Sequence, residues 1–209
     1  MASQGDARTV VYQIDADDRL SYVNENWNRF ARENATPEIA GDAILGRLLW
    51  DFIADRETQY LYQAVVQRVR ASDITVRLPL RCDAPDRRRF LMMEVGSSGE
   101  DEVRFTTVTV REEPRETVLL LDPQAARSDA ELPVCSWCKR VQVGEAGSEW
   151  MEVEEAVARL ELFDVYPLPR LSHRMCPRCR EQFRSGLGAM GRGAPAVQEQ
   201  SNFRDEQRF

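Results

Sequence analysis

Two pairs of cysteines are the residues whose type and spacing most directly suggest chemistry. Cys135-Ser-Trp-Cys138 and Cys176-Pro-Arg-Cys179 are both CxxC motifs, and 37 residues separate them. A CxxC turn presents two sulfurs to one ion, and four thiolates complete the tetrahedral shell that structural Zn²⁺ prefers. We therefore expect a zinc site built from these four cysteines, although a single iron ion also suits four thiolates.

His173, the only histidine of the chain, lies three residues before Cys176. Imidazole binds zinc, and it also donates hydrogen bonds to groups that bind zinc. His173 is therefore either an alternative ligand or a neighbour of a ligating thiolate, and we favour four cysteines because they already fill the shell. The competing interpretation is redox chemistry, with two disulfides or one reactive pair. Neither motif lies in a βαβ pattern, which argues against that interpretation.

The fifth cysteine, Cys82, lies in an arginine-rich segment that ends with Arg87, Arg88 and Arg89. Guanidinium groups bind carboxylates and phosphates, so an anion or partner site is one interpretation of this segment. The other is a solvated hairpin loop whose arginines pair with Asp83 and Asp86, and we favour it. A lone cysteine is inert unless its pKa is lowered, so we expect Cys82 to be an unreactive thiol rather than a redox-sensitive one.

Composition divides the chain into four parts. Residues 8–118 form an expected first domain, 119–131 a polar linker, 132–185 the cysteine domain, and 186–209 a glycine-containing flexible tail. The formal net charge of −7 belongs entirely to residues 1–131, which hold 17 basic and 24 acidic groups, whereas 132–185 hold 8 of each. A neutral cysteine domain argues against a nucleic-acid partner, since DNA binding needs clustered positive charge.

Periodicity predicts the elements that would position these residues. In the first domain, a hairpin over 10–23 is followed by helical patterns over 24–34, 41–53 and 56–71, with Asn24 as an expected N-cap. Period-two patterns over 74–80, 90–95 and 103–110 predict three further strands. The expected fold class is therefore α+β, with a five-stranded antiparallel sheet covered by helices on one face and a small zinc-knuckle domain. In the cysteine domain, Trp150, Val153 and Val157 predict a helix over 148–163.

The first domain resembles a PAS domain in the order of its elements and in three motifs. These are Asp-x-x-x-x-Leu-x-Tyr-Val-Asn at 15–24, Val-Asn-x-x-Trp-x-x-Phe-Ala at 23–31, and Gly-x-x-x-x-Asp-x-Ile at 46–53. The resemblance implies a sensory or protein-docking module with a ligand pocket between helices and sheet. The segment lacks the cysteine-containing helix of flavin-binding light sensors and any histidine for haem, and Cys82 is its one candidate thiolate ligand. We expect an apolar or small organic ligand, or none.

The second domain is similar to a small cysteine module attached to bacterial PAS-containing signalling proteins. The matching residues are Cys135-Ser-Trp-Cys-Lys-Arg-Val141, Trp150, Val153-Glu154 and Leu171-Ser-His-Arg-Met-Cys-Pro-Arg-Cys179, with Arg174 where the pattern has Gly. The resemblance implies metal binding.

Together these observations predict a non-enzymatic bacterial signalling or adaptor protein that binds a protein partner or itself. The alternatives are a redox- or metal-responsive sensor that uses the four cysteines and, with less support, a DNA-binding regulator. We expect no enzyme, since four thiolates leave the metal no open position and one histidine leaves no Ser–His pair elsewhere. No signal peptide or apolar span is evident, so we expect a cytoplasmic protein without membrane contact.

Overall fold

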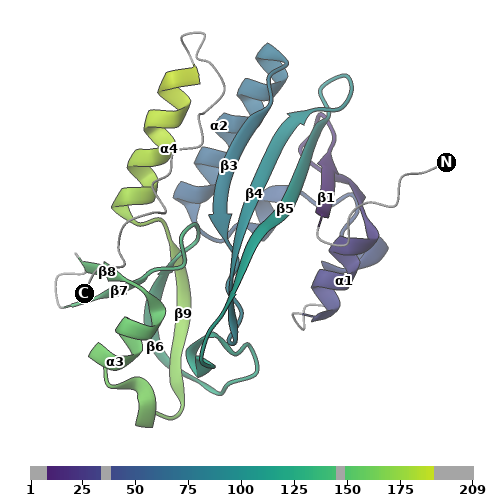
Figure 1. Cartoon of the computed structure of the whole chain (residues 1–209). Helices are drawn as coiled ribbons and strands as arrows, with labels where there is room; N and C mark the ends of the chain where they lie inside the picture. Colours follow the sequence, from purple (N-terminus) through teal and green to yellow (C-terminus); the bar gives the residue numbers. More distant parts are fainter. Residues whose placement is uncertain (1–8, 34–38, 145–148, 191–209) are drawn as a thin grey trace. The chain divides into compact units, whose positions relative to one another are not determined.

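The computed structural model describes residues 9–33, 39–144 and 149–190 (Figure 1). The chain divides into two compact units, residues 1–176 and 177–209. The first unit contains two β-sheets with their helices, and the described part of the second is a single helix, α4 (Pro177–Met190). Within the described residues, no helix is long and apolar enough to cross a membrane.

The larger sheet has five antiparallel strands in the order β2-β1-β5-β4-β3. Its strands are β1 (Thr9–Ile14), β2 (Leu20–Val23), β3 (Val76–Arg81), β4 (Arg87–Ser97) and β5 (Val103–Pro114). The predicted α+β class with a five-stranded antiparallel sheet is therefore confirmed. Strand β1 is the first strand of this sheet in the sequence and β5 is the last, and the two pair directly with each other (Figure 1).

Alternation along the strands explains why they form. In β3, Val76 and Leu78 are buried while Arg77 between them is exposed, and in β5 Val103 and Phe105 are buried on either side of exposed Arg104. Successive side chains of a strand point to opposite faces, so this pattern buries one face of the sheet. The core against that face is completed by Ile14, Leu20, Val65, Val66, Val69 and Val95, all at most 1% exposed.

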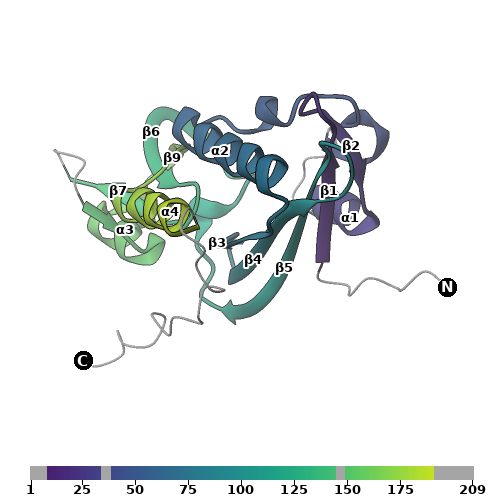
Figure 2. The same cartoon turned by 90° about the horizontal axis from the view of Figure 1, so that it is seen from above.

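Two α-helices pack against this sheet. Helix α1 (Glu25–Glu33) contacts β1, and α2 (Arg56–Ser72) lies over β4 and β5 (Figure 2). Asn24 caps α1 as predicted, because its side-chain oxygen accepts a 3.0 Å hydrogen bond from the Trp27 amide. Asp55 caps α2 in the same way through the amides of Glu57 and Thr58. The helical pattern over 41–53 forms two short 3₁₀ turns instead, η2 (Gly41–Ala43) and η3 (Leu49–Phe52).

The smaller sheet has the order β8-β7-β6-β9. Its strands are β6 (Arg127–Cys135), β7 (Val141–Val143), β8 (Glu149–Met151) and β9 (Leu168–Arg174). Strands β6 and β9 are parallel, and the remaining pairs are antiparallel. Helix α3 (Val153–Arg159) and the 3₁₀ turn η5 (Leu162–Asp164) connect β8 to β9. The core of this sheet contains Val118, Leu120, Leu132, Val134, Val141, Val143, Met151, Val153 and Ala156.

Three ranges differ from the sequence expectations. Residues 119–131, expected as a linker, contain the 3₁₀ turn η4 (Leu119–Leu121) and the first part of β6, and Leu120 is buried in the core of the second sheet. Trp150, expected on a helix, lies in β8, because the helix begins only at Val153. Of the expected tail, 186–190 belong to α4 and 191–209 lie outside the described residues.

Candidate metal centre

Parallel pairing of β6 and β9 explains how two CxxC motifs 37 residues apart meet. Cys135 is the last residue of β6 and pairs in register with Arg174, the last residue of β9. Because the strands run in the same direction, their carboxyl ends lie at the same edge of the sheet. The chain leaves β6 directly into the first motif, and it leaves β9 two residues before Cys176. The described part of the intervening segment contains β7, β8, α3 and η5, after which β9 leads to the second motif.

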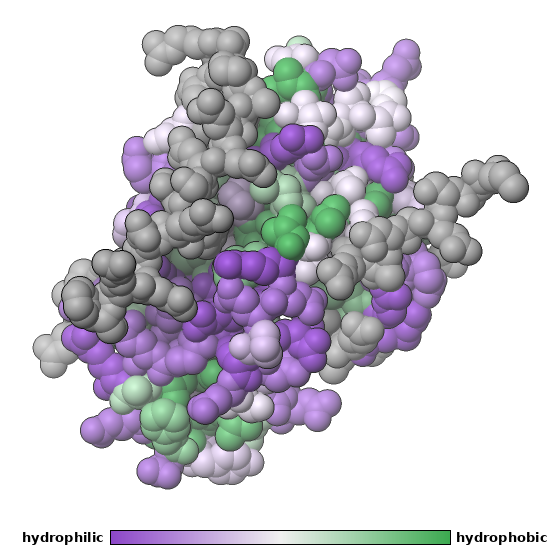
Figure 3. All heavy atoms as spheres, viewed as in Figure 1, coloured by the Kyte–Doolittle hydropathy of each residue, from purple (hydrophilic) through white to green (hydrophobic). Residues whose placement is uncertain are grey.

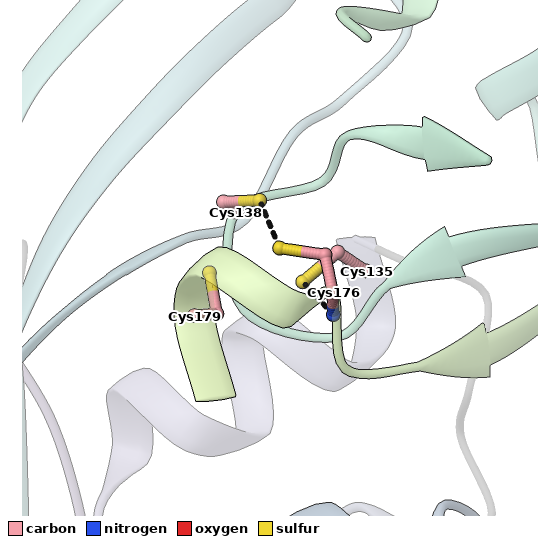
Figure 4. Close-up of side chains that lie close together, drawn as sticks. All are labelled: Cys135, Cys138, Cys176 and Cys179. Atoms are coloured by element: carbon pink, nitrogen blue, oxygen red, sulfur yellow. Dashed lines mark hydrogen bonds between the residues drawn. The ribbon is translucent and has the colours of Figure 1, made fainter. Parts of the chain in front are cut away.

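The structure brings the four predicted cysteines together (Figure 4). Their sulfurs all lie within 4.8 Å of one another, and Cys135, Cys176 and Cys179 are buried while Cys138 is partly exposed. The sulfurs of Cys138 and Cys176 are 3.7 Å apart. A tetrahedron with zinc–sulfur bonds of about 2.3 Å has sulfur–sulfur edges of about 3.8 Å. The cluster can therefore hold one metal ion, whereas a disulfide needs sulfurs about 2.05 Å apart.

The first motif forms a hydrogen-bonded knuckle, which we define as residues 135–140. The Lys139 amide donates to the Cys135 carbonyl at 3.1 Å, and the Cys135 amide donates to the Arg140 carbonyl at 2.7 Å. Lys139 adopts a left-handed backbone with φ of 62° to close this turn. The Cys176 amide donates to the Cys135 sulfur at 3.4 Å, which joins the second motif to the knuckle. This contact fixes the second motif beside the sulfur of the first.

His173 lies in β9, opposite Val134, and is not a member of the cysteine cluster. Partial burial of its imidazole and the nearby charge of Lys139 lower its pKa, while the carboxylate of Asp55 and the sulfur of Cys135 oppose that shift. Its residue neighbours the metal ligands through the backbone, because it pairs with the residue that precedes Cys135. Among the described residues, the metal-ligand group contains the four cysteines and not His173. The structure therefore favours the interpretation of His173 as a neighbour of the ligands over that of a direct ligand.

A buried group of charges that sequence inspection missed joins the two sheets. The Arg81 guanidinium at the end of β3 forms ion pairs with Asp83 and with Glu152, the latter through contacts of 2.8 and 3.0 Å. Arg115 binds Asp83 at 3.3 Å and Glu154 at 3.1 Å. The Arg81, Asp83 and Arg115 side chains are only 9%, 1% and 6% exposed. We call these five side chains the charge cluster.

Electrostatics within the charge cluster favours its ionised form. Burial by itself would lower the pKa of Arg81, but the hydrogen bonds and charges of Asp83 and Glu152 raise that pKa above its ordinary value. Burial acts against ionisation of Glu154 as well, yet its backbone hydrogen bond together with Arg88 and Arg115 keeps its pKa below the ordinary value. The ion-pair partners in the charge cluster are separated by up to 71 residues in the sequence, so no local sequence pattern predicts that they meet.

The three arginines that begin β4 also form ion pairs. Arg87 binds Asp86 at 2.8 Å, Arg88 binds Glu154 at 2.9 Å, and Arg89 lies 3.9 Å from Glu112. The expected pairs of Asp83 and Asp86 with arginines are present, as Arg81–Asp83 and Arg87–Asp86, but Asp83 is buried rather than solvated, and Arg88 and Arg89 pair with glutamates elsewhere in the chain. The Cys82 thiol is free and partly exposed, and its residue is held by a 3.0 Å hydrogen bond from its amide to the Arg89 carbonyl.

Comparison with known proteins assigns no family to the chain. No family model matches it, and no curated protein matches it.

Proposed function

We propose that this chain is a non-enzymatic bacterial signalling or adaptor protein in which a PAS-like sensor or docking domain is joined to a structural zinc module. The observation that carries the proposal is the convergence of four thiols, three of them buried, at distances suited to one tetrahedral ion. A metal held by four thiolates has no open position for water or substrate. The site therefore supports a structural role better than a catalytic one, and zinc is the ion we propose.

Two features support the PAS-like assignment of the first domain. Its five antiparallel strands and intervening helices follow the order that the motif resemblance implies. Asn24, in the Val-Asn-x-x-Trp motif, caps α1 and also accepts a 3.1 Å hydrogen bond from the Val11 amide of β1. The motif thus joins the first hairpin to the first helix.

A protein partner or self-association completes the proposal. Phe163, Val165 and Tyr166 follow α3 and are 75%, 41% and 80% exposed, and apolar atoms gather at that end of the molecular face in Figure 3. Neighbouring exposed aromatic side chains support contact with another protein surface. The balanced charge of the cysteine module supports no nucleic-acid partner. Five free cysteines support a reducing, cytoplasmic location.

Native mass spectrometry with metal analysis of the purified full chain tests this function. We expect one zinc ion per chain, and the same spectra report bound small molecules and oligomeric state. Cys135→Ser and Cys179→Ser should each abolish stoichiometric metal. Cys82→Ser is the matched control, because Cys82 lies outside the cluster, and it should retain the ion. Absence of metal from the wild type, or equal retention by all three variants, would refute the zinc module; iron at one equivalent would change the assigned ion.

A redox-responsive site is the second candidate, favoured by the partial exposure of Cys138 beside Cys176. In that reaction the two thiolates would lose two electrons to hydrogen peroxide, which with two protons becomes two waters, and the new disulfide would release the metal. Zinc release during a peroxide titration, measured with a zinc-sensitive dye and reversed by dithiothreitol and added zinc, would support it. Retention of zinc in excess peroxide would refute the redox-responsive site and would be consistent with a structural zinc site.

A further inference from the structure

The knuckle that holds two of the four cysteines is also bonded to the five-stranded sheet. The carbonyl of Trp137, between Cys135 and Cys138, accepts a 2.9 Å hydrogen bond from the Arg81 amide at the end of β3. The indole of Trp137 packs edge-to-face on the Tyr62 ring of α2, with centroids 5.8 Å apart. Both rings are nearly buried, at 7% and 9% exposure. One residue between two metal ligands therefore contacts both the edge strand and the main helix of the other domain.

The contact to Tyr62 continues through a chain of rings across the sheet core. Tyr62 lies 6.4 Å from Phe105 of β5, and Phe105 stacks on Tyr12 of β1 at 4.5 Å and an interplanar angle of 7°. Tyr12 in turn meets Trp27 of α1 edge-to-face at 5.3 Å. Protein interiors are close-packed, so displacement of one ring in such a chain requires its neighbours to move. The knuckle is thus the end of a packed path that reaches α1.

The charge cluster fixes the same junction from a second direction. Arg81, whose amide binds the knuckle, directs its guanidinium to Glu152, and Arg140 of the knuckle binds that same carboxylate at 3.3 Å. Glu152 immediately precedes α3. Its carboxylate therefore binds Arg140 of the knuckle and Arg81 of the edge strand β3 at the start of that helix. A metal ion that bridges Cys135 and Cys138 would fix the backbone on both sides of Trp137. Without it, the knuckle would be held only by its own hydrogen bonds and these contacts.

We propose that Trp137 couples metal occupancy of the four-cysteine site to the order of the five-stranded domain, so that the metal stabilises β3 and α2, which do not ligate it. The inference rests on the proposed metal binding and goes beyond it, since a purely structural zinc module would stabilise only its own sheet. Linkage is reciprocal. If metal binding raises the affinity for a ligand or partner that orders α2 or β5, that ligand raises the metal affinity of the cysteines by the same factor.

Hydrogen exchange of the full chain with mass spectrometric detection tests the coupling. The zinc-loaded protein is compared with protein stripped by a chelator under reducing conditions, and zinc content is measured in both. We expect amides in β3 and in α2 around Tyr62 to exchange about tenfold faster after zinc removal. Amides of β2, the opposite edge strand, should change less than about twofold.

Variants at Trp137 identify the coupling residue. Trp137→Ala keeps all four cysteines, so it should bind one zinc, yet the zinc-dependent difference at α2 should shrink to less than about twofold. Trp137→Phe should restore most of the difference, because an aromatic ring again meets Tyr62. Trp150→Ala is the matched control, a tryptophan of the same module in β8, and should leave the difference intact. If Trp137→Ala does not fold, Tyr62→Leu removes the same contact from the α2 side.

The outcomes separate this inference from the proposed function. If the wild type binds no metal, both fall together. If it binds one zinc but β3 and α2 exchange equally with and without it, the coupling is refuted and the zinc module stands. If zinc protects α2 as fully in Trp137→Ala as in the wild type, the Trp137 side chain does not carry the coupling.

Discussion

Replacement of Arg81 by methionine tests the buried charge cluster most directly. Arg81→Met keeps an unbranched side chain of similar length at the end of β3 but removes the guanidinium from Asp83 and Glu152. Four hydrogen bonds to these carboxylates are lost. The consequence is unequal for the two acids. The Glu152 side chain is 30% exposed and can rehydrate, whereas that of Asp83 is 1% exposed and cannot.

The magnitude follows mainly from the two bonds to Asp83. Hydrogen bonds to charged groups contribute about 1.5–3 kcal/mol each, and removal of one partner from a buried ion pair costs about 3–5 kcal/mol. Arg115 remains 3.3 Å from Asp83 and retains part of its compensation. We therefore expect the free energy of unfolding to fall by about 3–5 kcal/mol. For a unit of this size, that corresponds to a melting temperature lower by about 6–20 °C.

A matched control lies on the same strand. Arg77 pairs with Glu94 at 2.7 Å, but the two side chains are 63% and 40% exposed, so Arg77→Met should cost no more than about 1 kcal/mol. Urea unfolding of metal-loaded wild type and variants, followed by circular dichroism, gives the comparison. The double variant Arg81→Met/Asp83→Asn should be more stable than Arg81→Met alone, because the uncompensated carboxylate is gone. Equal losses at Arg81 and Arg77, or no recovery in the double variant, would refute the reasoning.

Three further predictions concern a helix cap, an acid-sensitive carboxylate and the knuckle turn. Asp55→Ala removes the acceptor for two amides at the start of α2 and should lower the free energy of unfolding by about 1 kcal/mol in urea titrations, whereas Asp55→Ser should keep most of it. The pKa of Glu154 is lowered from 4.5, so its contribution to stability is present above that pH and is lost as the pH falls through the folded pKa. Glu154→Gln should therefore lower the free energy of unfolding at pH 7, and its difference from wild type should shrink progressively in unfolding curves measured below pH 4.5. Lys139 holds a φ of 62°, so Lys139→Gly should preserve metal affinity in chelator competition, whereas the β-branched Lys139→Val should weaken it by about tenfold, and equal affinities would contradict the strained turn.

Local patterns predicted those parts of the fold that are determined by nearby residues. The alternation of Val76, Arg77 and Leu78 marks β3 because one face of the sheet is buried, and Asn24 marks the start of α1 because its side chain is an acceptor for free amides. The cysteines were predictable for the same reason, since each CxxC motif is a local spacing of residues. Their meeting was expected from the number of ligands that zinc needs, although no pattern revealed the parallel β6–β9 pair that achieves it.

Features that depend on distant partners were not predictable in this way. Trp150 follows a helical spacing with Val153, but three residues of β8 are too few to show a period of two, and pairing with β7 decides the conformation. Leu120 belongs to the apolar run 118–121 at the start of the expected linker. Its burial depends on Val134 of β6 and Val141 of β7, which are distant in the sequence. Arg81 was expected in a solvated loop, whereas its partner Glu152 is 71 residues away.

The junction between the two sheets changes what a structural metal would mean in this chain. In a separate zinc knuckle, the binding energy of the ion stabilises only the residues around it. Here Trp137 and Arg81 connect those residues to α2 and β3 through buried contacts, so part of the binding energy of a metal would stabilise the five-stranded sheet. Because such coupling is reciprocal, the metal affinity would depend on how well ordered the five-stranded domain is. A signal that loosens the Tyr62–Phe105 contact would weaken metal binding without touching a cysteine, and this is the simplest physical route by which the two modules could act as one.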